Sequence, residues 1–315
     1  MRKDYTRKNL RPEVEQMLAA ARAAKPPEPT PIATMRTMNL ASAAYFNVGA
    51  PKIGLEREIR VGGAAGDLRA MMWAPVAEPY GLPVVLHFHG GGFVFMLPES
   101  YAKPCKEIAI AANAIVISVD YRLGPEHPYP AAHDDAFAAY QWLRAHAAEL
   151  GGDPSRIALA GESAGGGLAA ATALRSVASG VPPAGVATAC AWLDMSLSSP
   201  AFVALGPDDP LLDTASLSYW RQSYAPDATT WGNADLTPIK ADLSGFPATS
   251  IVVGGIDPLY DDGVSFVEAL HDARIDVELH DYDGMPHIFW CFPPLHNLTD
   301  ATARQAAFLR RVLHP

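Results

Sequence analysis

One serine of the chain stands between glycines, in the pentapeptide GESAG at residues 161–165. This G-x-S-x-G pattern follows the apolar run RIALA and leads into GGGLAAATALRSVA, which is typical of a helix. In a sharp turn from strand to helix, glycines on either side of Ser163 avoid Cβ clashes and hold its hydroxyl clear of the backbone. The pattern therefore predicts a nucleophile for acyl transfer, and a purely structural turn is the alternative.

A serine nucleophile needs a general base and an acid that orients the base. Among the ten histidines, His287 in YDGMPHIFW is the best candidate for the base, because it lies in a loop after the last predicted strand. Asp257 follows the predicted strand TSIVVGG and is the candidate acid, and Asp194, which also follows a strand, is the runner-up. The order serine, aspartate, histidine along the chain is the order found in α/β-hydrolases.

The nucleophile also needs hydrogen-bond donors for the oxyanion that forms in the reaction. The run LHFHGGGF places His89 and the glycines of residues 90–92 just after a predicted strand. Glycines let backbone N–H groups approach a ligand closely, and this loop can act together with the N–H of Ala164 beside the nucleophile. A flexible glycine turn is the alternative interpretation.

Other titratable residues have structural explanations. His87 and His89 form an H-x-H pair of the kind that binds zinc in some hydrolases, but no further ligand set follows, so no metal site is expected. Asp261 and Asp262 are expected to cap the helix that begins beside them. The segment YRLGPEHPYPAAHDD holds Arg122, Glu126, His127 and His133. A buried polar network that shapes the loop is expected for them, and a catalytic role is the alternative.

Short apolar runs rich in valine and isoleucine predict the strands that would position these residues. Alanine-rich stretches with helical character, such as DDAFAAYQWLRAHAAEL, lie between several of them. Strands that alternate with helices predict an α/β fold with a mostly parallel sheet covered on both faces. The predicted strands are LPVVLHFH, NAIVISVDY, RIALAG, VATACAWL, TSIVVGG and VELHDY.

Two segments stand outside this alternation. Near the N-terminus, RPEVEQMLAAARAAK has helical periodicity and PPEPTP then ends the helix, so we expect a helical segment packed on the body. A second segment holds prolines, aspartates and the helix-like TASLSYWRQSYA, and such long excursions often form a lid. We expect an N-terminal cap segment at residues 1–50, a catalytic core at 51–193 and 237–315, and a cap insertion at 194–236.

Composition excludes several function classes. Hydrophobic residues make up 49% of the 315 residues, which allows a sizeable core, and the formal net charge of −10 argues against nucleic-acid or anionic-membrane partners. The three cysteines lack disulfide or zinc spacing, and no signal peptide or membrane span is expected. A cytoplasmic protein with free thiols is the expectation.

Taken in order, the motifs HGGGF, DYRLGPEHPYPAAHDD, GDPSRIALAGESAGG, DPLYDDG and GMPHIFW resemble the hormone-sensitive-lipase-like group of α/β-hydrolases, the bacterial family IV carboxylesterases. The likeness runs from about Pro83 to His287. It implies an eight-stranded, mostly parallel sheet under a helical cap formed by the N-terminus and one insertion. It also implies a triad and three oxyanion N–H donors, namely Ser163, Asp257 and His287 with Gly91, Gly92 and Ala164.

Three positions depart from the residues usual in that group. Glu162 stands where Asp or Thr is frequent, Gly167 where Asn is common, and Ile288 where Gly usually follows the histidine. Ile288 adds bulk beside the expected base.

The sequence thus predicts a serine carboxylesterase that hydrolyses short-to-medium acyl esters of small molecules through an acyl-enzyme intermediate, without a metal or organic cofactor. An amidase or deacetylase with the same triad is one alternative, and a ligand-binding relative without catalysis is another. The resemblance is also compatible with a homodimer. Four aromatic residues are candidates for the apolar lining of the substrate pocket, with core packing as an equal alternative for each, namely Trp192, Phe202, Tyr219 and Trp220.

Overall fold

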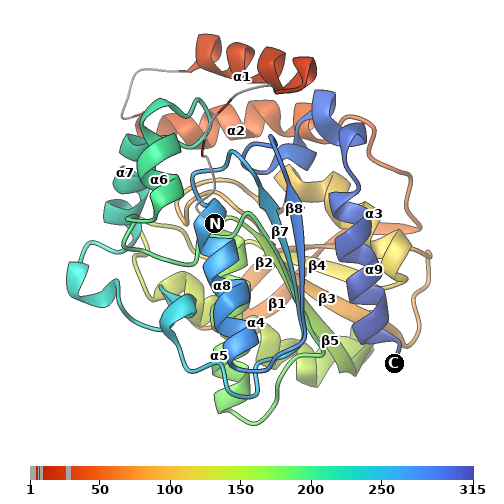
Figure 1. The fold of residues 1–315 in the computed structure, drawn as a ribbon. Helices are drawn as coiled ribbons and strands as arrows, with labels where there is room; N and C mark the ends of the chain where they lie inside the picture. The colour runs from red at the N-terminus through yellow and green to blue at the C-terminus, as the bar shows by residue number, and fades with distance from the viewer. Residues whose placement is uncertain (1–4, 6, 8–9, 26–29) are drawn as a thin grey trace.

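The chain folds around one eight-stranded sheet with the strand order β1-β2-β4-β3-β5-β6-β7-β8 (Figure 1). The computed structural model describes residues 5, 7, 10–25 and 30–315. Strand β2 pairs antiparallel with β1 and with β4, and the other neighbours are parallel, which confirms the predicted, mostly parallel α/β-hydrolase sheet. The strands are β1 (Leu55–Gly63), β2 (Gly66–Ala74), β3 (Leu82–Phe88), β4 (Ile115–Val119), β5 (Gly152–Glu162), β6 (Val186–Ala189), β7 (Thr249–Gly254) and β8 (Val277–Tyr282).

The central strands are the ones that the apolar runs predicted. All residues of β4, β6 and β7 are buried, as expected for parallel strands covered on both faces. The hairpin of β1 and β2 was not among the runs used for the prediction. Strand β1 reads LEREIRVGG and is largely exposed at the sheet edge, so it offers no continuous apolar run.

Helices cover both faces of the sheet. Figure 1 shows α3 (Ala102–Ala112) and α9 (Ala301–Leu313) packed together on one side of the sheet. On the other side lie α4 (Ala131–His146), α5 (Ala164–Ala178) and α8 (Tyr260–Asp272). Each layer buries its own apolar cluster against the sheet. This frame places the loops that follow the parallel strands at one common edge.

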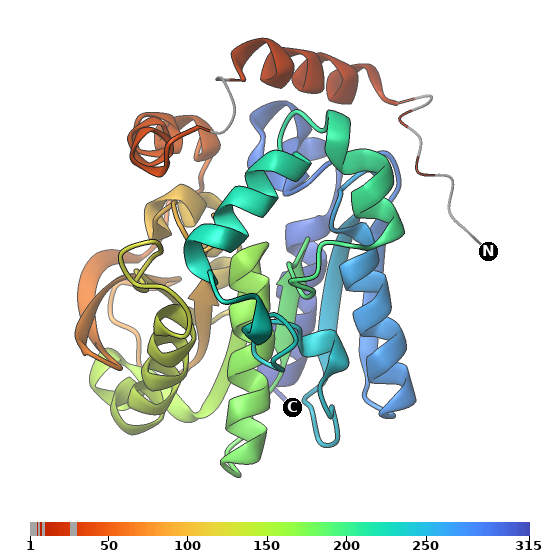
Figure 2. The ribbon, with the colours of Figure 1, turned by 90° about the vertical axis from the view of Figure 1, so that its left-hand side faces the viewer.

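Four further helices lie at that edge, beyond the carboxyl ends of the central strands (Figures 1 and 2). They are α1 (Pro12–Ala24), α2 (Ile32–Phe46), α6 (Pro200–Leu205) and α7 (Thr214–Tyr224). The helices predicted in RPEVEQMLAAARAAK and TASLSYWRQSYA correspond to α1 and α7, whereas α2 and α6 were not predicted. Residues 26–29 of the breaker PPEPTP lie outside the described residues. Within the described part of the chain, no helix has the length and apolar character that crossing a membrane requires.

Candidate active site

Ser163 stands alone in the turn between β5, which ends at Glu162, and α5, which begins at Ala164. Its backbone has φ 54° and ψ −123°, a conformation that non-glycine residues rarely adopt. A Cβ atom on Gly161 would overlap the carbonyl of Gly165, and one on Gly165 would overlap the carbonyl of Phe88. The flanking glycines are therefore required for the turn that presents the serine hydroxyl at the edge of the sheet.

The structure brings the predicted base and acid to this serine. The loop after β8 carries His287, whose Nε2 lies 3.1 Å from Ser163 Oγ. The loop after β7 carries Asp257, whose Oδ2 lies 2.8 Å from Nδ1 of His287. The other carboxylate oxygen of Asp257 accepts the N–H of Leu259 at 2.8 Å, which fixes the carboxylate plane. All three side chains are buried. The two hydrogen bonds therefore connect serine, histidine and aspartate away from bulk water.

The glycine loop after β3 borders the same space. Gly91 and Gly92 have φ values of 111° and 57°, and a Cβ atom on Gly92 would lie 2.6 Å from the ring of Trp220. The backbone therefore approaches the space above Ser163 closely, where a larger residue would obstruct it. Ala164 is the first residue of α5. Because the first N–H groups of a helix have no acceptor within the helix, the N–H of Ala164 is available to a ligand.

His89 supports this loop instead of facing the substrate space. Its ring stacks on Tyr121 at 4.3 Å between centroids, and the Tyr121 hydroxyl donates to the His89 carbonyl at 2.7 Å. Burial lowers the pKa of His89 to about 3, so the ring is neutral at physiological pH. The histidine of the glycine motif is thus a packing element of the loop.

A cavity of about 220 Å³ connects the serine, the histidine and the glycine loop. Of the four aromatic residues expected to line it, only Trp220 does so among the described residues, so that expectation is largely wrong. Trp192 and Phe202 are buried in the main core, and Tyr219 packs against it. Ile288, singled out beside the base, does line the cavity. Sequence reasoning missed the other walls, which are mainly apolar and give no chemical signal: Phe46, Phe95, Met96, Tyr101, Leu211, Leu212 and Phe292.

Two of the three departures from the family pattern, Glu162 and Gly167, have local physical explanations. The carboxylate of Glu162 is buried and bonds His87 at 2.8 Å. A Cβ atom on Gly167 would lie 2.6 Å from the carbonyl oxygen of Trp192, so the close helix packing here excludes a side chain. Ile288 adopts a left-handed backbone with φ 45° and lines the cavity beside the histidine.

The remaining acidic candidates do not join the site. Asp194 bonds the N–H of Ser196 and lies 3.5 Å from Lys240 Nζ. Asp261 and Asp262 lie in the first turn of α8, as expected, but their hydrogen bonds do not cap that helix. Asp262 instead accepts the N–H groups of residues 193 and 194 at 2.9 and 3.0 Å, and thereby ties α8 to the chain that follows β6.

The polar network predicted in the segment YRLGPEHPYPAAHDD is only partly present. His133 is buried and bonds the hydroxyl of Tyr224 at 2.7 Å, and Arg122 pairs with the buried Asp135 at 2.8 Å. Glu126 and His127 are exposed, so the expectation that they belong to a buried network is wrong. They lie in a surface loop, where both carboxylate oxygens of Glu126 accept hydrogen bonds from the guanidinium of Arg36 at 2.8 Å.

Cys190, Asp257 and His287 place ligand-type atoms within 4.8 Å of one another, the arrangement that a metal site would need. Burial and then the Asp257 carboxylate raise the pKa of the Cys190 thiol well above its ordinary value, so this thiol is protonated and a poor ligand. The H-x-H pair is divided between two tasks, since His87 bonds Glu162 and His89 stacks on Tyr121.

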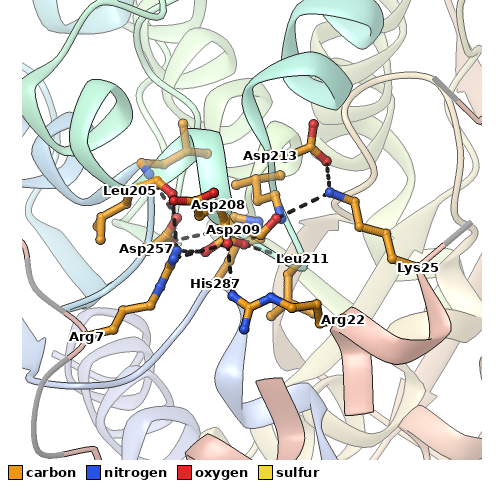
Figure 3. Close-up of polar contacts among 12 residues, drawn as sticks. Arg7, Arg22, Lys25, Leu205, Asp208, Asp209, Leu211, Asp213, Asp257 and His287 are labelled. Atoms are coloured by element: carbon orange, nitrogen blue, oxygen red, sulfur yellow. Dashed lines mark hydrogen bonds and ion pairs between the residues drawn. The ribbon is translucent and has the colours of Figure 1, made fainter. Parts of the chain in front are cut away.

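Cations from the N-terminal part of the chain bind the loop that carries two of the cavity walls, Leu211 and Leu212 (Figure 3). Arg7 pairs with the buried Asp209 at 2.5 Å, and Lys25 pairs with Asp213 at 2.8 Å. Asp209 in turn accepts the N–H groups of Leu211 and Leu212 at 2.8 and 2.7 Å. These contacts hold that wall of the cavity in place.

Comparisons with known proteins give the same picture. A model of the α/β-hydrolase fold family matches residues 85–291. The chain is 38% identical over 264 residues to esterase LipI of Mycobacterium tuberculosis and 39% identical over 267 residues to carboxylesterase NlhH of the same species, covering 82% of each chain in both comparisons. Human hormone-sensitive lipase is 41% identical over 163 residues, which are 51% of this chain and 15% of that protein. An esterase from Pyrobaculum calidifontis superposes with a TM-score of 0.91 at 29% identity, with 96% of this chain and 98% of the other covered.

Proposed function

The chain belongs to the hormone-sensitive-lipase-like carboxylesterases of the α/β-hydrolase family, and we propose that it hydrolyses short-to-medium acyl esters through an acyl-enzyme intermediate on Ser163. The observation that carries this proposal is the series of two hydrogen bonds, 3.1 and 2.8 Å long, that runs from Ser163 through His287 to Asp257 beside a largely apolar cavity. Such a series turns an unreactive hydroxyl into a nucleophile at neutral pH.

In the first step, Nε2 of His287 takes the proton of Ser163 Oγ as that oxygen bonds to the carbonyl carbon of the ester. The carboxylate of Asp257 holds Nδ1–H of the ring and stabilises the imidazolium that forms. The carbonyl electron pair moves to its oxygen, and the N–H groups of Gly91, Gly92 and Ala164 stabilise this oxyanion.

The tetrahedral intermediate then collapses, and the bond between carbon and the alkoxide oxygen breaks. His287 gives its proton to the departing alcohol, which leaves the acyl group on Ser163. Water enters, loses a proton to the same nitrogen and attacks the acyl carbonyl. A second collapse returns the proton to Ser163 and releases the carboxylic acid. Nε2 of His287 accepts and donates every proton in the reaction. The other reacting groups are Ser163, the ester and water.

Size and polarity of the cavity support a substrate with modest acyl length. The volume of about 220 Å³ lies below the usual range for drug-sized ligands, and the wall is mostly hydrophobic and aromatic. We propose that residues 1–50 and 194–236 act as a cap over this cavity. Phe46 of α2 and Trp220 of α7 contribute walls to it, which supports that assignment.

Ser163→Ala, compared with wild type on p-nitrophenyl esters of increasing acyl length, tests the proposal. We expect the substitution to remove nearly all hydrolysis, by a factor on the order of 10⁴ or more, because the residual rate comes from the oxyanion donors alone. Matched anilides separate an esterase from an amidase with the same triad. A variant with wild-type rates would exclude Ser163 as the nucleophile, and a wild type inactive on the whole series would favour a ligand-binding role.

A further inference from the structure

A buried ion pair lies directly below the nucleophile, formed by two residues that have no part in the mechanism above. Nε2 of His87 lies 2.8 Å from Oε2 of Glu162, the residue that precedes Ser163. His87 is fully buried and Glu162 is only 2% exposed. The other ring nitrogen of His87 lies 2.8 Å from the hydroxyl of Ser118, so both of its polar atoms are engaged.

These contacts cross three adjacent strands of the sheet. Ser118 belongs to β4, His87 to β3 and Glu162 to β5. In the parallel registers, His87 stands opposite Ser118 on one side and opposite Ala160 on the other. The side-chain bonds therefore link the strands close to their carboxyl ends, in addition to the backbone ladder.

Several titratable groups face the pair from neighbouring elements. Tyr101 lies with its ring 5.9 Å from that of His87, and the thiol of Cys105 on α3 lies against the imidazole. Burial opposes the charged form of His87, but Cys105 and Glu162 outweigh it, so that the pKa of His87 lies well above its ordinary value. The two side chains form a hydrogen-bonded pair in the interior, where a buried polar group that loses its partner is costly.

The two strands joined by this pair carry the two catalytic loops. Strand β3 leads into the glycine loop at residues 89–92, and β5 leads into Ser163. The loops touch, since a Cβ atom on Gly90 would lie 3.3 Å from Cβ of Ser163 and 3.2 Å from the carbonyl oxygen of Glu162. A shift of β3 relative to β5 would therefore change the distance between the oxyanion donors and the reacting serine.

We propose that His87 and Glu162 are positioning residues for the esterase reaction, which fix the oxyanion loop against the nucleophile turn. This inference rests on the proposed function of Ser163. The donors of an oxyanion loop bind the substrate carbonyl weakly and the transition state strongly, so a displaced loop lowers kcat and leaves KM nearly unchanged. A purely structural pair would alter the amount of folded protein but not kcat for each active site.

Two substitutions at Glu162 separate position from charge. Glu162→Asp keeps the charge but shortens the side chain by one methylene, so it breaks or shifts the 2.8 Å bond to His87. Glu162→Gln removes the charge but keeps an oxygen acceptor at the same reach. Because both changes are small, the variants should fold, and titration of reactive serine with diethyl p-nitrophenyl phosphate counts the active sites in each preparation.

We expect kcat per titrated site on p-nitrophenyl butyrate to fall roughly tenfold to hundredfold in Glu162→Asp, with KM within about twofold of wild type. In Glu162→Gln, kcat should stay within about threefold. The matched control varies length and charge separately at Asp235, as Asp235→Glu and Asp235→Asn, because this carboxylate pairs with Arg175 near the far end of α5. Neither control should change kcat by more than about twofold.

Two results would overturn the inference. If kcat per site is unchanged in Glu162→Asp, the pair does not position the loop. If kcat falls in Glu162→Gln but not in Glu162→Asp, the site requires the charge and not the position of this side chain. A rise in KM at constant kcat would also contradict it. Failure of the phosphate to label wild-type protein would instead count against the proposed function of Ser163 itself.

Discussion

Nε2 of His287 lies 3.1 Å from Oγ of Ser163, although the two residues are 124 positions apart in the chain. One residue follows β8 at the edge of the sheet and the other follows β5 near its centre. Two strands lie between them, so only a loop that returns over the carboxyl ends of β6 and β7 brings the ring to the hydroxyl. The hydrogen bond is therefore a property of the sheet topology, and it can be tested through the residues that hold the ring.

Asp257→Asn tests the orientation of the histidine ring. The asparagine side chain carries no negative charge and can donate its amide N–H to Nδ1 of His287. The imidazole then adopts the wrong tautomer, and the imidazolium that forms in the reaction loses its stabilisation. We expect kcat to fall by a factor on the order of 10⁴, with the variant folded, as measured by ester hydrolysis at saturating substrate. Asp194→Asn serves as the comparison and should retain activity, and the opposite pattern would assign the acid to Asp194.

Trp220→Ala tests the size limit of the substrate cavity. Trp220 lines the catalytic cavity of about 220 Å³ and also a neighbouring cavity of about 360 Å³ beside α1 and α2. Removal of the indole joins the two spaces, so we expect the preferred acyl chain of p-nitrophenyl esters to become longer. Tyr219→Ala removes a neighbouring ring that lines neither cavity, and its chain-length profile should match wild type. A profile unchanged in Trp220→Ala would show that the indole does not limit the chain.

Asp262→Asn tests the buried carboxyl group that links α8 to residues 193 and 194. Burial raises the pKa of Asp262 from 3.8 to about 8, so the folded protein binds a proton that the unfolded chain releases between these values. Stability contributed by this protonated group is present at low pH and is lost as the pH rises toward 8. The amide stays neutral at every pH. The free energy of unfolding of Asp262→Asn should therefore exceed that of wild type by about 1 to 3 kcal/mol at pH 8, and should differ little from it at pH 4.

Thermal unfolding of Asp262→Asn and wild-type protein at both pH values provides the measurement. Equal differences in Tm at pH 4 and pH 8 would contradict the raised pKa. A loss of stability at both values would show that the two N–H groups prefer the carboxylate over the amide oxygen.

Gly167→Ala tests the close packing behind the nucleophile. Its Cβ atom would lie 2.6 Å from the carbonyl oxygen of Trp192, and this backbone has to move before the methyl group fits. We expect a loss of about 1 to 3 kcal/mol in the free energy of unfolding, measured in urea. Gly232→Ala is the matched control, because a Cβ atom there meets nothing within 4 Å, and it should change stability by a few tenths of a kcal/mol. Equal effects of the two substitutions would contradict the packing argument.

Much of the fold could be predicted from local patterns. The run VELHDY coincides with β8 at the edge of the sheet, and the apolar runs before it identify the central strands β3 to β7, because a buried parallel strand has to be apolar along its length. The hairpin of β1 and β2 escaped the prediction because β1 is largely exposed and rich in charged residues, and the largely buried run AMMWA of β2 follows the polar residues with which that strand begins. Helix α2 was missed for a similar reason, since only Ile32 and Asn39 of its residues are buried and its apolar residues form no marked stripe.

The sequence by itself identified Ser163, Asp257 and His287 as candidates, because the residue type, the neighbouring predicted strand and the order along the chain can all be read from the linear sequence. It also marked Glu162 and Gly167 as unusual. Only the tertiary structure decided which groups they meet. Glu162 has a partner because β3 lies beside β5, and Gly167 is bare because the carbonyl of Trp192 fills its space. Contacts of this kind depend on which strands become neighbours, and that depends on the packing of the whole chain and not on any short stretch of it.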